Sequence, residues 1–327
     1  MVEINEATPG PRETLVEVKH IGLCGTDLRT YTGSNPIVTY PRVIGHEIGA
    51  VLTEDTEIAE TRWPAGTVVT VHPYTACGSC SACRNGRPNA CRYNETLGNQ
   101  RDGAAVSRFV ASPEHLYPLP DFTTEAAAAV EPLSVGFHAV ARGDVREQDT
   151  VVVLGTGMIG LGAVAGAAAR GSRTIAVDLD DRKLEIAASV GASVTVNAEK
   201  ESVAERVAQL TDAEGASVVI EAIGLPATYR QAIDLACFTG RVVFIGYAKE
   251  DVAFTTKLFV SKELDIRGSR NASRKDFESV IEAIRSGNVA IDNLVTQRYS
   301  GERVDQALRY WSENPNAVTK LLLEVEA

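Results

Sequence analysis

Between residues 149 and 268 the sequence alternates short apolar runs with helix-type segments. The apolar runs cover 150–154, 174–177, 193–196, 218–222, 241–245 and 264–267. Helix-type stretches such as 159–170, 182–190 and 202–210 lie between them. Strands that alternate with helices in this way form a doubly wound parallel sheet with helices on both faces. This stretch therefore predicts an α/β fold.

The first turn of this region carries three glycines at the spacing of a dinucleotide-binding loop. Gly155, Gly157 and Gly160 follow the first apolar run and precede the first helix. The first glycine permits a tight turn, the second lets a pyrophosphate approach the backbone, and the third lets the helix pack on the strand. The helix N-terminus adds free N–H groups for the phosphates. An ordinary glycine turn is the alternative.

Asp178 ends the second apolar run, at the place where a carboxylate accepts hydrogen bonds from ribose hydroxyls and repels a 2′-phosphate. This position predicts NAD in preference to NADP as the cofactor. Asp180 and Asp181 add negative charge nearby, whereas Arg182 and Lys183 partly oppose it. A surface aspartate without a ligand is the alternative.

Four cysteines crowd into one short loop, CGSCSACRNGRPNAC, as Cys77, Cys80, Cys83 and Cys91. The spacing C-x2-C-x2-C-x7-C is typical of a metal site and not of a disulfide framework, so we expect a reducing compartment, the cytoplasm. Four thiolates can close a tetrahedron around Zn²⁺, and a closed site is structural. An iron–sulfur cluster and metal-free thiols are the alternatives.

The overall charge and hydropathy exclude several classes of partner. The chain has 327 residues, of which 44% are hydrophobic, and a formal net charge of -11. This size predicts two domains with a sizeable core, and the acidic balance disfavours binding to nucleic acid or anionic membranes. No apolar run reaches the ~18 residues of a membrane span, and the N-terminus lacks the pattern of a signal peptide.

The flanking regions differ from the alternating one. Residues 1–131 are rich in Pro, Gly and Cys, with short β-type runs at 14–19, 43–44, 67–71 and 107–110, which predict a β-rich body. Residues 271–327 contain helix-type segments at 274–286 and 302–313 and strand-type segments at 294–299 and 319–325. We therefore expect a nucleotide-binding domain at 133–270, inserted between the two parts, 1–132 and 271–327, of a β-rich catalytic domain.

Three further segments contain metal-ligand residue types. Cys24 lies in GLCGTD, His46 and Glu47 lie in GHE, and Glu131 lies in VEPLSVGFH. One thiolate, one imidazole and one carboxylate can bind zinc and leave a fourth position open, as a catalytic zinc requires. Taken singly, Cys24 is equally a buried core thiol, His46 a structural histidine, and Glu131 a carboxylate at a helix start before Pro132.

The segments GLCGTD, YPRVIGHE, the cysteine loop, EPLSVGFH and GTGMIG occur here in one fixed order. Together they resemble the zinc-containing medium-chain alcohol dehydrogenase superfamily across essentially the whole chain. Glu131 in EPLSVGFHA resembles the polyol and sugar-acid branch, which includes sorbitol, galactitol, L-idonate and L-galactonate 5-dehydrogenases. The resemblance implies a GroES-like β-rich domain, an inserted Rossmann domain, and two zinc ions per chain, one catalytic and one structural.

The resemblance also implies roles for individual residues. Cys24 and His46 are implied as zinc ligands, and Glu47 and Glu131 as carboxylates that bind zinc directly, through water or by exchange. Asp27 is implied to orient the zinc histidine, and Thr26 to relay the substrate proton toward the cofactor ribose. The residues implied to contact the cofactor, besides the three glycines and Asp178, are Met158, Ile159, Lys183, Ile223, Gly224, Ile245 and Gly246.

The expected reaction is hydride transfer between NAD and a secondary alcohol of a polyol or sugar acid. Arg270 is implied to lie near this small-molecule substrate, with a domain-interface salt bridge as the alternative. A zinc-free quinone or enoyl reductase and a non-catalytic cofactor-binding relative are the rival functions. Relatives pair the edges of their nucleotide-domain sheets, so we expect a homodimer or homotetramer, formed here through 264–268.

Two departures from the family pattern bear on these expectations. Arg29 stands where the family often has a histidine that ends the proton relay. Either the relay ends at Thr26 and the ribose, or water completes it, or Arg29 attracts an anionic substrate. The family also opens with a further β-strand, and this sequence starts close to that strand's end, so we expect an N-terminal hairpin to be missing, through either a late start of the sequence or a true loss.

Overall fold

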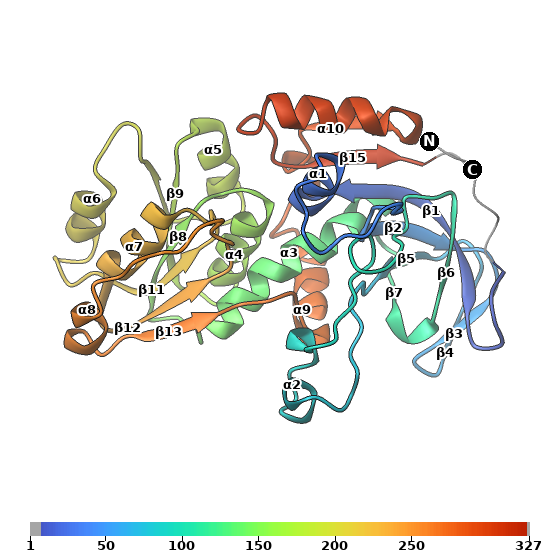
Figure 1. Ribbon diagram of the computed structural model, residues 1–327, viewed down its shortest axis with the longest axis horizontal. Helices are drawn as coiled ribbons and strands as arrows, with labels where there is room; N and C mark the ends of the chain where they lie inside the picture. Colours follow the sequence, from blue (N-terminus) through green and yellow to red (C-terminus); the bar gives the residue numbers. More distant parts are fainter. Residues whose placement is uncertain (1–7, 326–327) are drawn as a thin grey trace. The chain divides into compact units, whose positions relative to one another are not determined.

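The computed structural model describes residues 8–325, which form two units (Figure 1). One unit holds the chain up to Pro132 together with the stretch from Ile291 onward, and the other holds Leu133–Ala290. The expected boundary at 270/271 therefore lies too early. Helix α9 (Arg274–Arg285) belongs to the second unit, because its Phe277 is fully buried there and its Asp276 hydrogen-bonds His138 at 2.8 Å.

The second unit is built on a six-stranded sheet in the order β10-β9-β8-β11-β12-β13. All of its strand pairs are parallel, which confirms the doubly wound sheet expected from the sequence. Its strands are β8 (Thr150–Leu154), β9 (Arg173–Asp178), β10 (Val194–Asn197), β11 (Ala216–Glu221), β12 (Ala236–Phe244) and β13 (Asp265–Gly268). Its other helices are α4 (Met158–Ala168), α5 (Asp181–Ser189), α6 (Val203–Leu210), α7 (Pro226–Leu235) and α8 (Lys257–Ser261), and it receives the second half of α3 (Thr124–Arg142).

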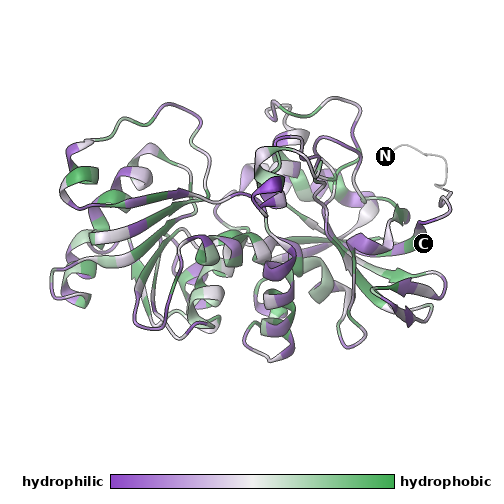
Figure 2. Cartoon of the chain, turned by 90° about the horizontal axis from the view of Figure 1, so that it is seen from below, coloured by the Kyte–Doolittle hydropathy of each residue, from purple (hydrophilic) through white to green (hydrophobic). Residues whose placement is uncertain are grey.

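The sheet forms because its central strands are β-branched and apolar on both faces. In β8, Val151, Val152, Val153 and Leu154 are fully buried, as expected for a strand that helices cover on both sides. In Figure 2 green, apolar stretches run along the strands of this sheet, and purple, polar residues recur on the loops. The order of the strands places the turn after β8 next to the end of β11, where the direction of winding reverses.

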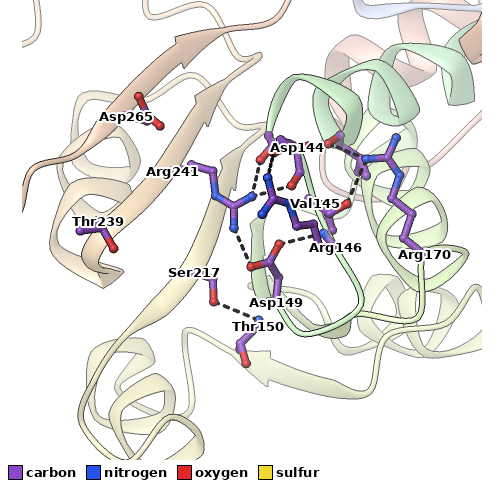
Figure 3. Close-up of polar contacts among 12 residues, drawn as sticks. Asp144, Val145, Arg146, Asp149, Thr150, Arg170, Ser217, Thr239, Arg241 and Asp265 are labelled. Atoms are coloured by element: carbon purple, nitrogen blue, oxygen red, sulfur yellow. Dashed lines mark hydrogen bonds and ion pairs between the residues drawn. The ribbon is translucent and has the colours of Figure 1, made fainter.

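A polar network ties together the opposite, amino ends of these strands (Figure 3). Arg241 stands in register with Val218 of β11 and with Asp265, the first residue of β13. Its guanidinium donates to Asp149 Oδ1 at 2.6 Å and to the carbonyl of Gly143 at 3.0 Å. Asp149 is buried, so this pair joins β12 to the connection between α3 and β8.

The first unit is built on a mostly antiparallel sheet in the order β14-β15-β1-β2-β5-β7, and β6 also pairs with β1. β14 and β15 are its parallel pair. Its strands are β1 (Thr14–Leu23), β2 (Glu47–Leu52), β5 (Val68–Val71), β6 (Arg108–Ala111), β7 (Leu116–Pro118), β14 (Gln297–Ser300) and β15 (Leu321–Glu324), with a separate hairpin of β3 (Thr56–Ile58) and β4 (Thr61–Trp63). Its helices are α1 (Gly25–Tyr31), α2 (Ser81–Arg84), α10 (Val304–Glu313) and the first part of α3.

Two local expectations are wrong. Residues 43–44 do not form a strand, because Gly45 turns the chain at φ +97° and the carbonyls of Val43 and Ile44 bond a loop at Gly103 and Ala105 instead. Glu131 does not start a helix, because α3 begins at Thr124 and continues through Pro132. None of the described helices combines the length and apolarity that crossing a membrane requires.

Candidate active site

Three of the implied zinc ligands come together in the first unit. Cys24 precedes α1 directly after β1, His46 precedes β2, and Glu47 is the first residue of β2. The antiparallel pairing of β1 with β2 sets Gly22 opposite Glu47 and so joins these segments. One ligand atom from each of Cys24, His46 and Glu47 lies within 4.8 Å of the other two. A single ion can therefore contact all three.

Asp27 connects the two segments that carry Cys24 and His46. Its Oδ2 accepts a hydrogen bond from the Cys24 N–H at 2.8 Å, and its Oδ1 accepts one from the Gly45 N–H at 3.3 Å. The distance from Oδ1 to His46 Nδ1 is 3.9 Å, too long for a hydrogen bond. Asp27 therefore acts on the histidine through its charge and through the backbone of the preceding residue.

The charges around His46 favour a cation at this place. His46 Nδ1 is buried and has no hydrogen-bond partner among the described residues. Burial alone would lower the pKa of His46, but Asp27, Cys24 and Glu131 raise it well above its usual value. A buried imidazole surrounded by a thiol and carboxylates is the donor set that zinc uses, so the residues present fit a zinc ion.

Glu131 lies near this cluster but is not one of the three residues that share it. It projects from the middle of α3, is buried, and accepts a short hydrogen bond from the hydroxyl of Tyr74. Burial, with a contribution from Glu47, raises the pKa of Glu131 to about 7, against the opposing effect of His46. The sequence analysis missed Tyr74, which no motif marks.

Lys320 is a second residue that the sequence analysis missed. It directly precedes β15, which pairs with the end of β1, and it is buried. Its Nζ donates to Glu47 Oε2 at 2.5 Å, to Glu47 Oε1 at 2.7 Å and to the Leu23 carbonyl at 3.0 Å. Glu47 therefore faces a lysine as well as Cys24 and His46. A lysine before an apolar strand carries no sequence signal for this contact.

The four loop cysteines form a second ligand cluster. Each of Cys77, Cys80, Cys83 and Cys91 offers a sulfur, and all four sulfurs lie within 4.8 Å of one another. Hydrogen bonds from the Ser79 backbone and side chain, with others, lower the pKa of Cys77 to about 6, whereas burial and the neighbouring thiols raise that of Cys83 to about 12. Four such thiols fit a closed zinc site.

A third group, His20, Glu125 and Glu324, also has ligand atoms within 4.8 Å of one another. No motif in the sequence indicated it. Arg298 already holds Glu125 through two hydrogen bonds of 2.8 Å, so this carboxylate is engaged in an ion pair. The group therefore serves as a polar cluster on the first unit.

The glycine loop of the second unit has the geometry expected of a phosphate-binding turn. Gly155 follows β8 at φ +90°, and Gly157 caps the N-terminus of α4. A Cβ on Gly160 would lie 1.9 Å from the Gly155 carbonyl, whereas a Cβ on Gly157 would meet nothing within 4 Å. Met158 and Ile159 form the first turn of α4. The backbone at Gly157 is thus open to a pyrophosphate.

Asp178 ends β9 beside this loop. Its Oδ2 accepts from both the N–H and the hydroxyl of Thr156 at 2.8 Å, and its Oδ1 accepts from Leu179 N at 2.8 Å and Asp180 N at 3.3 Å. Lys183 lies in the first turn of α5 and is half-buried. The carboxylate is therefore held in a fixed position next to the glycine loop.

The remaining cofactor residues follow the next two strands. Ile223 and Gly224 lie just after β11, and Ile245 and Gly246 lie just after β12. A Cβ on Gly155 would lie 2.5 Å from Ile223 Cγ1, so the loop after β11 contacts the glycine loop. The structure brings all of these positions to the carboxyl edge of the sheet, where parallel sheets bind their ligands.

Two further implied catalytic residues, Thr26 and Arg270, lie near the ends of secondary-structure elements. Thr26 lies in the first turn of α1, two residues after Cys24, and is partly exposed. Arg270 lies two residues after β13, in the second unit, and is exposed.

Comparison with known proteins decides the family. The alcohol dehydrogenase GroES-like domain family matches residues 10–121, and the zinc-binding dehydrogenase family matches residues 159–286. L-galactonate-5-dehydrogenase of Escherichia coli (strain K12) is 34% identical over 296 residues, which cover 89% of this chain and 85% of that protein. The chain belongs to the zinc-type medium-chain alcohol dehydrogenase family. The predicted family, fold class and type of enzyme are thereby confirmed.

Two further proteins resemble this zinc-type dehydrogenase over nearly its full length. Sorbitol dehydrogenase of Halalkalibacterium halodurans is 33% identical over 323 residues, which cover 97% of this chain and 93% of that protein. The solved structure of rspB from Escherichia coli CFT073, complexed with the cofactor NADH, has a TM-score of 0.89 and 30% identity, covering 99% of this chain and 95% of that one. This zinc-type dehydrogenase is thus an oxidoreductase that acts on a small molecule with a nicotinamide cofactor.

Proposed function

We propose that this enzyme oxidises a secondary alcohol of a polyol or sugar acid and transfers the hydride to NAD. The observation that carries the proposal is the cluster of half-buried Cys24 with buried His46 and Glu47, whose ligand atoms lie within 4.8 Å of one another. Similarity to a sorbitol dehydrogenase and to an L-galactonate-5-dehydrogenase supports the substrate class.

We assign two zinc ions to the chain. Cys77, Cys80, Cys83 and Cys91 would hold the structural ion, and Cys24 and His46 would hold the catalytic one. Glu47 and Glu131 are the two carboxylates available for its third protein ligand. Glu47 is adjacent to Cys24 and His46 but shared with Lys320, and Glu131 is bonded to Tyr74. The contacts of Glu47 with Lys320 and of Glu131 with Tyr74 both allow the two carboxylates to exchange as the third zinc ligand.

The metal, when bound, supplies Lewis acidity that lowers the pKa of a coordinated hydroxyl, and the nicotinamide accepts a hydride. The residues of the chain position the reactants and move the proton. We assign the outward transfer of the hydroxyl proton to Thr26; its position in the first turn of α1, two residues after Cys24, and its partial exposure support this role. Asp27 holds the segments of Cys24 and His46 together.

Cofactor selection and one contact with the substrate, that of Arg270, are assigned to the second unit. We propose that the glycine loop binds the pyrophosphate and that Asp178 selects NAD by repelling a 2′-phosphate. Met158, Ile159, Lys183, Ile223, Gly224, Ile245 and Gly246 are the further cofactor contacts. Arg270 is proposed to bind the carboxylate of a sugar acid, because a guanidinium can hold a carboxylate with two hydrogen bonds. The assembly proposed is a homodimer or homotetramer that uses the exposed edge strand β13.

The decisive experiment is a panel of polyols and aldonates assayed with NAD and with NADP, on protein whose zinc content has been measured. We expect NAD-dependent turnover of at least one polyol or sugar acid. Zinc-loaded protein that reduces neither cofactor with any member of the panel would sink the proposed substrate class. Turnover with NADP and not with NAD would overturn the assignment of Asp178.

A further inference from the structure

One buried carboxylate of the second unit joins two of the loops at the ligand-binding edge. Glu221 is the last residue of β11 and is 0% exposed. Its Oε1 accepts from Ile223 N at 2.9 Å and from Gly224 N at 2.7 Å, in the loop after β11. Its backbone carbonyl accepts from Ile245 N at 2.9 Å and Gly246 N at 3.2 Å, in the loop after β12. The side chain of Glu221 therefore holds the loop after β11, and its backbone carbonyl holds the loop after β12.

Helix α7 adds two further connections to the same centre. The Thr228 hydroxyl, in the first turn of α7, donates to Glu221 Oε1 at 2.8 Å. The hydroxyl of the next residue, Tyr229, donates a short hydrogen bond to the Gly246 carbonyl. Helix α7 is thus joined to Glu221 through Thr228 and to the loop after β12 directly through Tyr229.

The second oxygen of this carboxylate is buried without a hydrogen-bond partner among the described residues. A Cβ on Gly246 would lie 2.8 Å from this Oε2 and 2.3 Å from Gly224 N. A buried carboxylate oxygen without a hydrogen-bond partner lowers the stability of the fold, and such atoms are rare in native proteins. This unsatisfied oxygen lies where the loops after β11 and β12 approach each other.

The loops held by Glu221 expose large apolar side chains. Ile223 is 44% exposed, Leu225 54% and Tyr247 69%. Such side chains at the carboxyl edge of a parallel sheet form a surface suited to a planar ring. Because β11 and β12 lie on the opposite side of β8 from β9 and Asp178, this surface belongs to the nicotinamide half of a dinucleotide that crosses the switch point.

We propose that the side chain of Glu221 is a positioning group that fixes the loop after β11, and with it the start of α7, in the platform for the nicotinamide half of the cofactor. Its side chain acts through the N–H groups of Ile223 and Gly224 and the hydroxyl of Thr228. The inference rests on the proposed function, because it assigns one part of that cofactor site to a residue which no motif marked.

The test compares two ligands that share the adenosine and pyrophosphate parts. NADH carries the nicotinamide, and ADP-ribose lacks it. We expect Glu221→Ala to weaken NADH binding roughly tenfold or more, as loss of a buried set of hydrogen bonds implies, and to change ADP-ribose binding by less than about twofold. Glu221→Gln retains an acceptor for the three donors, so its loss of NADH affinity should be smaller. Titration of NADH fluorescence and calorimetry with ADP-ribose give the two affinities.

Ser217→Ala is the matched control, because Ser217 lies on the same strand and bonds the Thr150 N–H at 3.3 Å, at the other end of β11. It should leave the ratio of the two affinities unchanged. Thr228→Val reports independently if Glu221→Ala does not fold, since it removes one of the donors to the same carboxylate oxygen and should weaken NADH selectively. Equal weakening of both ligands, or no weakening of NADH, would overturn the role of Glu221. Binding of neither ligand by the unaltered protein would instead remove the cofactor site of the proposed function.

Discussion

Lys320 Nζ lies 2.5 Å from Glu47 Oε2, and both side chains are buried. The two residues are 273 positions apart and belong to β2 and to the segment that leads into β15. Burial lowers the pKa of Lys320, but Glu47 and Cys24 outweigh burial and raise it. Removing one partner of a buried ion pair strongly destabilises a protein, because the other charge then remains buried without a counter-charge.

We expect Lys320→Met to destabilise the metal-free protein by about 3–5 kcal/mol, because Glu47 is then buried without a counter-charge. Zinc supplies a counter-charge to Glu47, so the zinc-loaded variant should lose less stability. Thermal unfolding before and after chelation measures both losses. Lys320→Arg, which keeps the charge, is the control. An equal fall in Tm with and without zinc would contradict this role of the lysine.

Zinc content should separate the two cysteine sites. We expect about two zinc ions per unaltered chain and about one in Cys24→Ala, because the four-cysteine loop has its own closed donor set. Alcohol oxidation should be lost in this variant. Cys237→Ala is the matched control, since Cys237 lies outside both clusters, and it should keep both ions. Full turnover by Cys24→Ala with only one zinc would refute the catalytic assignment.

The Arg241–Asp149 contact should support the fold and not the chemistry. We expect Arg241→Met to lower the free energy of unfolding by about 3 kcal/mol, because Asp149 is left buried without its partner. Arg206→Met removes an exposed pair with Glu201 and should cost about 0.5 kcal/mol or less. Urea unfolding measures both. If Arg241→Met weakened NADH binding by a free energy as large as its loss of unfolding free energy, the network would also shape the cofactor site.

Asp276 should contribute to the stability of the protein toward acid. Burial tends to raise its pKa, but hydrogen bonds with His138 and Ser273 outweigh burial and lower the pKa below 3.8. The stabilisation is therefore complete above the ordinary aspartate pKa and is lost as the pH falls through the lowered one. Asp276→Asn should destabilise the protein near neutral pH and flatten this acid dependence.

Urea unfolding at pH values on either side of 3.8 tests the effect. Glu278→Gln, an exposed carboxyl on the same helix α9, should leave the acid dependence as it is. An unchanged slope in Asp276→Asn would show that other carboxyl groups govern the loss of stability in acid.

Arg270 should distinguish acidic from neutral substrates. We expect Arg270→Ala to lower kcat/KM for sugar acids roughly tenfold more than for neutral polyols, as loss of a charge-assisted pair of hydrogen bonds implies. Steady-state kinetics on an aldonate and on the matching alditol measure this ratio. Equal losses on both substrates would argue against a carboxylate contact.

The second unit was predictable because each of its central strands carries its own signal. Parallel strands covered on both faces are apolar throughout, so runs such as 150–154 and 218–222 stand out locally. Strand β2, EIGAVL, did not stand out, since it is short and contains a glycine. The full extent of α3 was hidden by Pro132, which usually marks a helix start or end but here lies inside the helix.

The candidate site was predictable only where motifs mark it. Cys24, His46 and Glu47 lie in recognisable segments, and the pairing of β1 with β2 brings them together. The contact of Lys320 with Glu47 depends on β15 pairing with β1 across nearly the whole chain, and no local pattern encodes such a partner.

The network around Arg241 ties the amino ends of the strands, whereas Gly155, Asp178 and Glu221 stand at or just beyond the carboxyl ends. The residues that stabilise the sheet and the residues assigned to cofactor binding thus lie at opposite ends of its strands. During evolution, residues in the ligand-binding loops can therefore be replaced while the network around Arg241 continues to stabilise the fold.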